Sequence, residues 1–188
     1  NRQQSRDGVW LDLPTTTEQV QAALRQIGIS SDNPQGLFIS GYFAEEEKRF
    51  AIPYNMVLAS NVDELNFLAS RLETLSTGER AELNAALQAP QSELFSIGRI
   101  TDFPENVDYY VHLPDVHGPA QLGDYYLNRS GMVDMPEEWK GGIDTAQFGR
   151  YVAQQEQGAF TQYGYLVKSG DEWQKVHEGQ PVPEEYRV

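Results

Sequence analysis

Two nearby histidines are the side chains best suited to metal chemistry in this sequence. His112 and His117 flank Asp115, so the segment offers two imidazoles and one carboxylate to an ion. Zinc-binding histidine pairs on a helix are usually four residues apart, and Pro114 and Gly118 argue against a helix here. We therefore interpret the segment as a surface loop and predict no metal site.

Neighbouring carboxylates could serve a glycoside hydrolase, which needs two acids facing each other across a cleft with different pKa values. Such neighbours occur at Glu45-Glu46-Glu47, Glu137-Glu138, Asp171-Glu172 and Glu184-Glu185. Adjacent side chains point in different directions on a helix or a strand. We therefore expect these acids to be solvated, although a deep cleft with two facing acids would favour a hydrolase.

The sequence lacks the motifs of other common chemistries. It contains no cysteine, which excludes disulfides, thiolate metal ligands and a cysteine nucleophile. It has no Walker phosphate-binding loop, no G-x-G-x-x-G fingerprint and no G-x-S-x-G nucleophile elbow. We predict a protein that is not an enzyme and that needs no cofactor.

The elements that hold these side chains form three regions, and we predict an α+β protein with three small domains. In residues 1–61, alternating apolar residues predict a strand over Gly8–Leu13. A capping-box pattern, Thr15-x-x-Glu18, then begins a helix. Strands over Leu37–Phe43 and Phe50–Leu58 complete an N-terminal α+β domain.

Residues 62–103 form the central region, which we predict to be a helical hairpin. Leucines at positions 65, 68, 72 and 75 have the spacing of one helical face. Ser76 and Glu79 form a second capping-box pattern, and Pro90 ends the helix that they begin. A link this short joins antiparallel helices, and the acids off the leucine face are expected to face solvent.

Residues 104–188 form the third region, a C-terminal α+β domain. The pattern predicts strands over Tyr109–Leu113 and Phe160–Lys168 and a helix over Gln121–Arg129. Asp134 and Asp144 are predicted to cap two further helices. Residues 170–188 have only a weak pattern.

The charge of the chain is strongly negative, with 28 Asp and Glu against 14 Lys and Arg and a formal net charge of −14. This charge argues against direct binding of nucleic acid, because nucleic-acid-binding proteins carry basic surfaces. No stretch approaches the roughly 20 apolar residues of a membrane span, and no signal peptide is visible. We expect a cytoplasmic protein, either an ordinary acidic one or one whose partner has a basic groove.

Dispersed carboxylates can imitate the phosphates of DNA. B-DNA carries two phosphates per base pair, so the 28 carboxylates correspond to at most about 14 base pairs. A protein that recognises phosphates by charge would also bind carboxylates at a similar spacing. The candidate partner-binding acids are Glu45, Glu46, Glu47, Glu64, Glu73, Glu79, Glu82, Asp124, Asp134, Glu137, Glu138, Asp144 and Glu156.

Several short motifs, taken in order, resemble the ArdA antirestriction family over roughly Gly8 to Lys168. The first two are Gly8-x-Trp10-x-x-x-Pro14 and Asp63-Glu64-Leu65-Asn66. A C-terminal block follows, with Leu122-Gly123-x-Tyr125-Tyr126, Gly131, Pro136, Ile143-Asp144 and Phe148-Gly149-Arg150. The segment Tyr125–Arg129 is less acidic than the antirestriction motif of the family, and residues 170–188 have no family counterpart that we can place.

The resemblance implies an elongated homodimer of three-domain chains, joined through the C-terminal domain. It implies that the dimer imitates bent duplex DNA, occupies the DNA-binding groove of type I restriction–modification enzymes and protects the DNA of conjugative elements. The candidate dimer-interface residues are Tyr125, Tyr126, Trp139, Phe148 and Tyr151. The alternative is an acidic, non-enzymatic adaptor or regulator that binds another basic DNA-binding protein.

Overall fold

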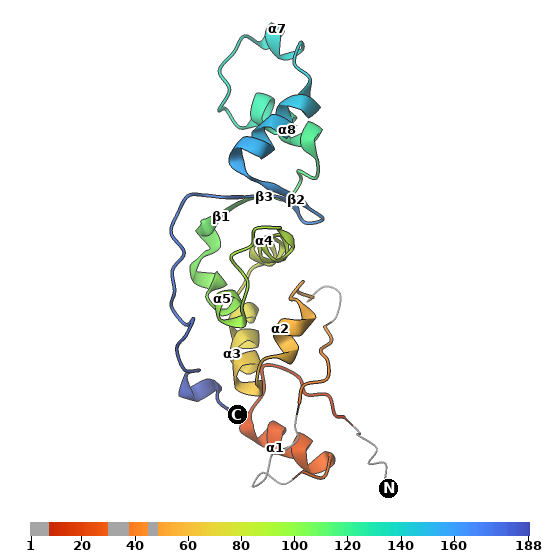
Figure 1. Ribbon diagram of the computed structural model, residues 1–188, viewed down its shortest axis with the longest axis vertical. Coiled ribbons are helices and arrows are strands. Elements are labelled where there is room, and N and C mark those ends of the chain that lie inside the picture. Colours follow the sequence, from red (N-terminus) through yellow and green to blue (C-terminus); the bar gives the residue numbers. More distant parts are fainter. Residues whose placement is uncertain (1–7, 30–37, 45–48) are drawn as a thin grey trace. The chain divides into compact units, whose positions relative to one another are not determined.

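The computed structural model describes residues 8–29, 38–44 and 49–188, and it combines helices with a small antiparallel sheet (Figure 1). This mixture is consistent with the predicted α+β class. The chain divides into two compact units: unit 1 comprises residues 1–75, 95–104 and 175–188, and unit 2 comprises residues 76–94 and 105–174. These units do not follow the three consecutive regions of the sequence, and the three-domain division stays a prediction.

Unit 1 is helical in its described part. Its helices are α1 (Thr17–Gln26), α2 (Tyr54–Leu58), α3 (Val62–Glu73) and α5 (Ile97–Thr101), with a 3-10 turn over Glu184–Tyr186. A further 3-10 turn, Phe103–Glu105, runs across the sequence boundary of the two units. Helix α3 packs on α5 and buries the leucines at positions 65, 68 and 72, which confirms the apolar face predicted for it.

The strands predicted for the N-terminal region are wrong where the structure describes them. Gly8–Leu13 is not a strand, and the described part of Leu37–Phe43 is not one either, while Leu37 itself lies outside the described residues. The end of Phe50–Leu58 is helix α2, which begins directly after Pro53. A proline cannot donate to a strand ladder but suits the start of a helix, and short apolar runs do not distinguish the two structures.

The cap of α1 lies one residue later than the sequence predicts. The Thr16 side chain accepts the Gln19 N–H, and the Gln19 side chain reaches back to the backbone of Thr16. The Thr15 N–H donates instead to Oδ1 of Asn66 in α3, at 2.6 Å, so it does not pair with the Glu18 carboxylate as the predicted capping box requires. A hydrogen bond between distant residues thus takes the place of the predicted local one.

The sheet of unit 2 has the strand order β1-β3-β2, with both pairs antiparallel. Its strands are β1 (Tyr110–Leu113), β2 (Ala159–Thr161) and β3 (Gly164–Lys168), and a 3-10 turn over Val107–Tyr109 precedes β1. The single strand predicted over Phe160–Lys168 is a hairpin, because Gly164 has a φ of +114° at the turn. Helix α4 (Thr77–Gln88) packs on β1 and β3 with the predicted Ser76–Glu79 capping box in place.

The remaining helices of unit 2 are α6 (Pro119–Asp124), a π-helical turn over Tyr125–Arg129, α7 (Glu137–Lys140) and α8 (Thr145–Glu156). Asp144 caps α8 as predicted, because its carboxylate accepts the Gln147 N–H at 2.9 Å. Asp134 does not cap α7, which begins after Pro136 with no side-chain cap. The proline already supplies the backbone angle that starts this helix.

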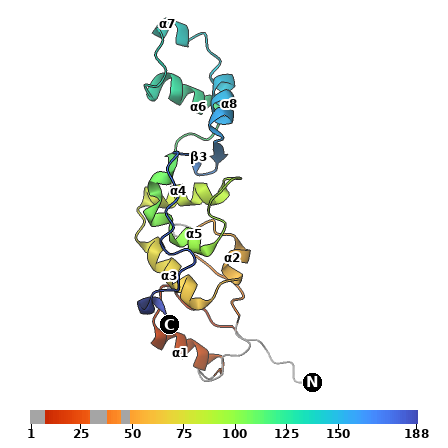
Figure 2. The same cartoon turned by 60° about the vertical axis from the view of Figure 1, so that its left-hand side comes forward.

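Helices α6 and α8 lie side by side, with their backbones in direct contact (Figure 2). A Cβ atom added to Gly123 would lie 1.9 Å from the Thr145 carbonyl oxygen, and one added to Gly149 would lie 1.8 Å from that of Pro119. The pair covers a core of Val116, Leu122, Ala153 and Tyr165. Only glycine permits so close an approach of two helices.

Every helix in the described ranges is too short or too polar to cross a lipid bilayer.

Replacing Gly123 by Ala should lower the free energy of unfolding by about 2 to 3 kcal/mol, because the added methyl group forces α6 away from α8. The matched control is Gly78→Ala, where no atom lies within 4 Å of the new Cβ. That change sits in the exposed first turn of α4 and should be neutral or slightly stabilising. Urea unfolding of both variants measures the difference, and equal stabilities would contradict the packing described here.

Candidate functional site

Four of the nine exposed acids of unit 2 lie in the segment between α6 and α8. Asp134, Glu137, Glu138 and Asp144 are all exposed in the structure. Of these, Glu137 lies 2.9 Å from Lys140, one turn along α7. The pair is at the surface, so it contributes little to stability and leaves most of the local charge negative.

Two of the candidate acids are held by neighbouring side chains. Asp124 accepts a hydrogen bond from Asn128 and lies 3.4 Å from the Arg129 guanidinium. Glu156, at the end of α8, accepts the hydroxyl protons of Tyr126 and Tyr165 on its two oxygens. Glu156 therefore has a structural role in the core of unit 2, whatever it adds to the surface charge.

The tyrosines around Glu156 are held in their neutral form. Burial raises the pKa of Tyr165 and of Tyr126, and the hydrogen bond to Glu156 raises both further. A phenolate beside this carboxylate would place two negative charges in a half-buried site. Both tyrosines therefore keep their hydroxyl protons at neutral pH and serve as hydrogen-bond donors to Glu156.

Glu64 and Glu79 act as capping residues. Glu64 in unit 1 and Glu79 in unit 2 each accept the backbone N–H of the helix N-cap residue, Asn61 or Ser76. The hydrogen bonds from Ser76 lower the pKa of Glu79, so this carboxylate is ionised at neutral pH. Both remain half-exposed, and Glu73 at the end of α3 is exposed as predicted.

Glu82 in α4 departs from the expectation that it faces solvent. Its Oε1 atom is buried and has no hydrogen-bond partner. The pKa of this carboxyl is raised to about 8, mainly by burial and to a smaller extent by the negative charges of Glu79 and Asp108. Glu82 is therefore largely protonated at neutral pH and adds little to the negative charge.

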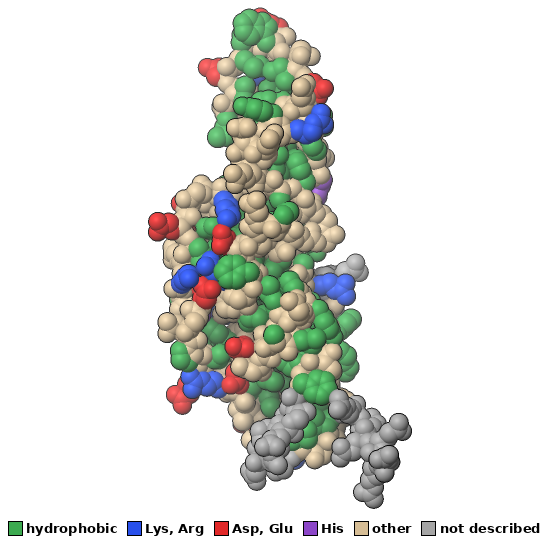
Figure 3. Space-filling model, in the orientation of Figure 1, with side chains coloured by type: hydrophobic (Ala, Val, Ile, Leu, Met, Phe, Trp, Pro, Cys, Tyr) green, Lys and Arg blue, Asp and Glu red, His purple; other side chains and the backbone are tan. Residues whose placement is uncertain are grey.

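Exposed carboxylates are dispersed over the described residues. On the face drawn in Figure 3 they stand singly, and Lys or Arg side chains lie beside several of them. The exposed acids are Asp12, Glu18, Glu73, Glu105, Asp108, Asp115, Asp134, Glu137, Glu138, Asp144, Asp171, Glu172, Glu184 and Glu185. The predicted Glu45, Glu46 and Glu47 lie outside the described residues.

Several of these exposed acids were not among the partner-binding acids predicted from the sequence. Asp108 and Asp115 flank β1, in a 3-10 turn and in the loop that follows the strand. Neither residue belongs to a run of acids or to a periodic helical face, so no local pattern identifies it as a partner-binding acid. The nearest signal is the excess of acids over bases in the C-terminal half of the sequence.

The charge is unequal between the two units. Unit 2 has 14 Asp and Glu against 5 Lys and Arg, a formal net charge of −9. Unit 1 has 14 acids against 9 bases, a net charge of −5. Unit 2 is therefore the stronger source of negative potential.

The five candidate interface aromatics fall into two groups. Trp139 is 66% exposed and Tyr151 is 60% exposed. Tyr125 and Tyr126 pack against the core of unit 2, and Phe148 is half-buried. Of the five, these two have the side chains that a second copy of the chain could reach, so Trp139 and Tyr151 remain the stronger candidates.

The histidines next to Asp115 have separate surroundings. Nε2 of His112 lies 2.7 Å from the carbonyl oxygen of Tyr163, across the sheet, and the backbone N–H of His117 donates to Gln121. Among the residues with described positions, these two histidines and Asp115 do not converge on a common metal position.

The comparisons with known proteins identify one family. A family model described as antirestriction protein (ArdA) matches residues 4–167 of the 188-residue chain. No curated protein matches the chain. The matched range includes both exposed aromatics and all of the candidate acids.

The raised pKa of Glu82 predicts a pH-dependent stability that Glu82→Gln removes. The pKa of Glu82 is 4.5 in the unfolded chain and about 8 in the folded chain. Its contribution to stability is therefore complete below pH 4.5 and is lost as the pH rises through about 8. Between pH 6 and pH 8 the free energy of unfolding of the unchanged chain should fall by on the order of 1 kcal/mol relative to that of the variant, after allowance for partial solvent screening.

Urea unfolding at several pH values measures this difference. The control is Glu18→Gln, because Glu18 is exposed and its pKa is lowered by hydrogen bonding to Thr16. Its charge is constant over this pH range, so the change should leave the pH dependence as it was. An unchanged pH dependence in Glu82→Gln would show that this carboxyl is ionised and solvated.

Proposed function

Because the chain belongs to the ArdA antirestriction family, we propose that it inhibits type I restriction–modification enzymes by occupying their DNA-binding groove as an imitation of duplex DNA. The family is one of antirestriction proteins, which act as inhibitors of restriction enzymes. The observation that carries the proposal is the family match over residues 4–167, in a chain with a formal net charge of −14.

Exposed carboxylates give the proposal its physical basis. The fourteen exposed acids of the described residues equal the phosphate charge of about seven base pairs. Asp134, Glu137, Glu138 and Asp144 follow one another along one segment, so they form the densest group in unit 2. A groove lined with Lys and Arg would attract this surface at a distance and bind it quickly.

We also propose that the protein acts as a homodimer that joins through unit 2. Two copies double the number of displayed carboxylates to the equivalent of about 14 base pairs. Trp139 and Tyr151 supply the exposed apolar surface that a stable contact between copies needs. Trp139 directly follows Glu137 and Glu138 in α7, so a contact through it would place the acidic segments of two copies close together.

The alternative function is that of an acidic adaptor for another basic DNA-binding protein. It shares the charge with the first proposal, but it does not require the partner to be a restriction enzyme. Direct competition with DNA for a type I enzyme separates the two functions.

The first expected outcome is displacement of duplex DNA. Adding this protein to a type I enzyme bound to labelled duplex should release the DNA without forming a ternary complex. Because salt screens charges beyond about 8 Å at physiological ionic strength, displacement should weaken at least about tenfold between roughly 50 and 200 mM salt. A stable complex that contains the enzyme, DNA and this protein together would contradict the proposal that the protein imitates DNA.

Clustered charge removal tests which acids take part. The variant Asp134→Asn, Glu137→Gln, Glu138→Gln should weaken displacement more than any single one of these changes, because each exposed carboxylate adds only a small share. The control Glu172→Gln, Glu184→Gln, Glu185→Gln removes the same charge outside the family match and should weaken it less. Equal effects would mean that net charge alone matters.

The second expected outcome is self-association through Trp139 and Tyr151. Their joint replacement by Ala should shift a dimer to a monomer in sedimentation experiments, since large buried aromatics dominate interface energies. Trp10 is 73% exposed in unit 1 and provides the control, Trp10→Ala, which should leave the dimer intact. A monomer at every concentration of the unchanged chain would rule out the dimer.

A further inference from the structure

The last fourteen residues of the chain, 175–188, belong to unit 1 although they follow unit 2 in sequence. We call this segment the strap. It lies beyond the family match, which ends at residue 167. Its 3-10 turn packs against α3, beside which the chain ends in both views (Figures 1 and 2).

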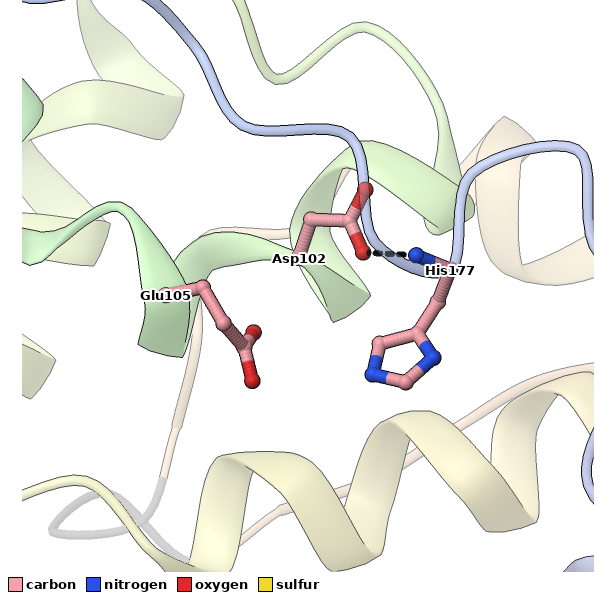
Figure 4. Close-up of side chains that lie close together, drawn as sticks. All are labelled: Asp102, Glu105 and His177. Atoms are coloured by element: carbon pink, nitrogen blue, oxygen red, sulfur yellow. Dashed lines mark hydrogen bonds between the residues drawn. The ribbon is translucent and has the colours of Figure 1, made fainter.

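The first anchor of the strap is the carboxylate of Asp102, which is fully buried at the end of α5. It accepts the backbone N–H groups of Val176, His177 and Glu178 at 3.2, 2.6 and 3.1 Å. Figure 4 shows the bond from His177; Glu105, also drawn there, belongs to unit 2. Three convergent N–H donors satisfy a carboxylate that would otherwise be costly to bury.

A turn of the strap presents these donors. Gly179 has a φ of +78°, and the N–H of Gln180 donates to the carbonyl of His177 at 2.9 Å. A Cβ added to Gly98 in α5 would lie 3.3 Å from the Cα of Glu178, so glycine there lets the turn approach the helix. Beside it, the Glu178 carboxylate lies 2.9 Å from the largely buried Arg99 guanidinium.

The second anchor is apolar. Phe67 in α3 is buried, and its ring lies 4.9 Å from that of His177 and 4.8 Å from that of Tyr186, between ring centroids. Two of the aromatic contacts of this core side chain thus come from the strap. Their removal would expose an apolar face of α3 to water.

The third anchor is polar and links three parts of unit 1. The buried Asn66 amide donates to the Tyr186 carbonyl at 3.0 Å and exchanges hydrogen bonds with the backbone of Thr15. Asp63 accepts the N–H of the last residue, Val188, at 2.9 Å. One face of α3 therefore holds the N-terminal segment and the strap together.

We propose that the strap completes the fold of unit 1, which binds it as a peptide ligand and loses its helical packing when the strap is removed. Loss of the strap leaves the Asp102 carboxylate, the Arg99 guanidinium and the Phe67 ring without these contacts. The strap thereby controls the state of unit 1. The strap carries three acids and two bases, so its removal changes the net charge by only one.

Hydrogen exchange on a chain that ends at Gln174 tests the proposal. The amides of α3 and α5 should exchange at least about tenfold faster than in the full chain, while those of α6 and α8 remain as protected as before. A synthetic peptide of residues 175–188, added in excess, should restore the protection of α3 and α5. Unchanged protection of these helices, or an equal loss in α6 and α8, overturns the proposal.

The full-length variant Asp102→Asn provides a second test that keeps every residue of the strap. An amide accepts hydrogen bonds more weakly than a carboxylate and adds two donors among three existing ones. The amides of residues 176–178 should therefore exchange at least about tenfold faster. The control Glu185→Gln changes an exposed acid of the strap and should have no effect. Equal exchange in the two variants would overturn the proposal.

This inference is separate from the inhibition of a restriction enzyme. Hydrogen exchange reports the state of unit 1 without any partner. In the DNA-displacement experiment, the chain that ends at Gln174 should compete less well than the full chain even though its charge is nearly the same. If the full chain does not displace DNA at all, the proposed function fails and the exchange results still stand.

Discussion

The cost of taking a carboxylate out of water is the constraint on which the rest of this structure depends. With 28 acids in 188 residues, folding is possible only if each carboxylate stays in water, gains donors or gives up its charge. All three solutions occur. The exposed acids remain in water, Asp102 and Glu156 receive several hydrogen bonds, and Glu82 takes up a proton. The acids that remain charged and exposed are those available to a partner.

The residues that carry the family resemblance in unit 2 are largely structural. Gly123 and Gly149 let α6 and α8 touch, Leu122 is buried between them and the sheet, and Asp144 caps α8. These residues hold the two helices together and, apart from Asp144, are not themselves the source of the surface charge of unit 2. Most acids of unit 2 lie outside these motif residues. Their positions depend on the packing of α6 and α8, although they do not belong to the motifs that carry the resemblance.

The chain passes repeatedly between its two units, and this makes distant segments depend on one another. Unit 1 contains the last residues of the chain, which follow β3 in sequence, and its N-terminal segment is held by the same Asn66 that holds the strap. Non-local contacts of this kind stabilise only the assembled unit, because each segment alone has too little apolar surface to fold. A short C-terminal segment can therefore have a large effect on unit 1.

Local rules in the sequence predicted the elements whose signals lie within one or two helical turns. The leucine face of α3, the Ser76–Glu79 capping box of α4, the Asp144 cap of α8 and strand β1 were all predicted correctly. The resemblance to the antirestriction family was also carried by short motifs, and the family match confirms it. Residue spacing is enough to predict these helix caps and apolar faces, because the residues that form them are only three or four positions apart.

Only the tertiary structure decided the properties that depend on residues far apart in the chain. The cap of α1 is Thr16, while the predicted cap, Thr15, bonds to Asn66, and the Oε1 atom of Glu82 is buried although its helical position suggested solvent. The last residues have only a weak pattern in the sequence, yet backbone N–H groups among them donate to Asp102, more than 70 positions earlier. The sequence determined the charge and the local elements of this protein. Which carboxylates stay charged and exposed was decided by the fold, because burial and hydrogen bonding depend on neighbours that the linear order does not specify.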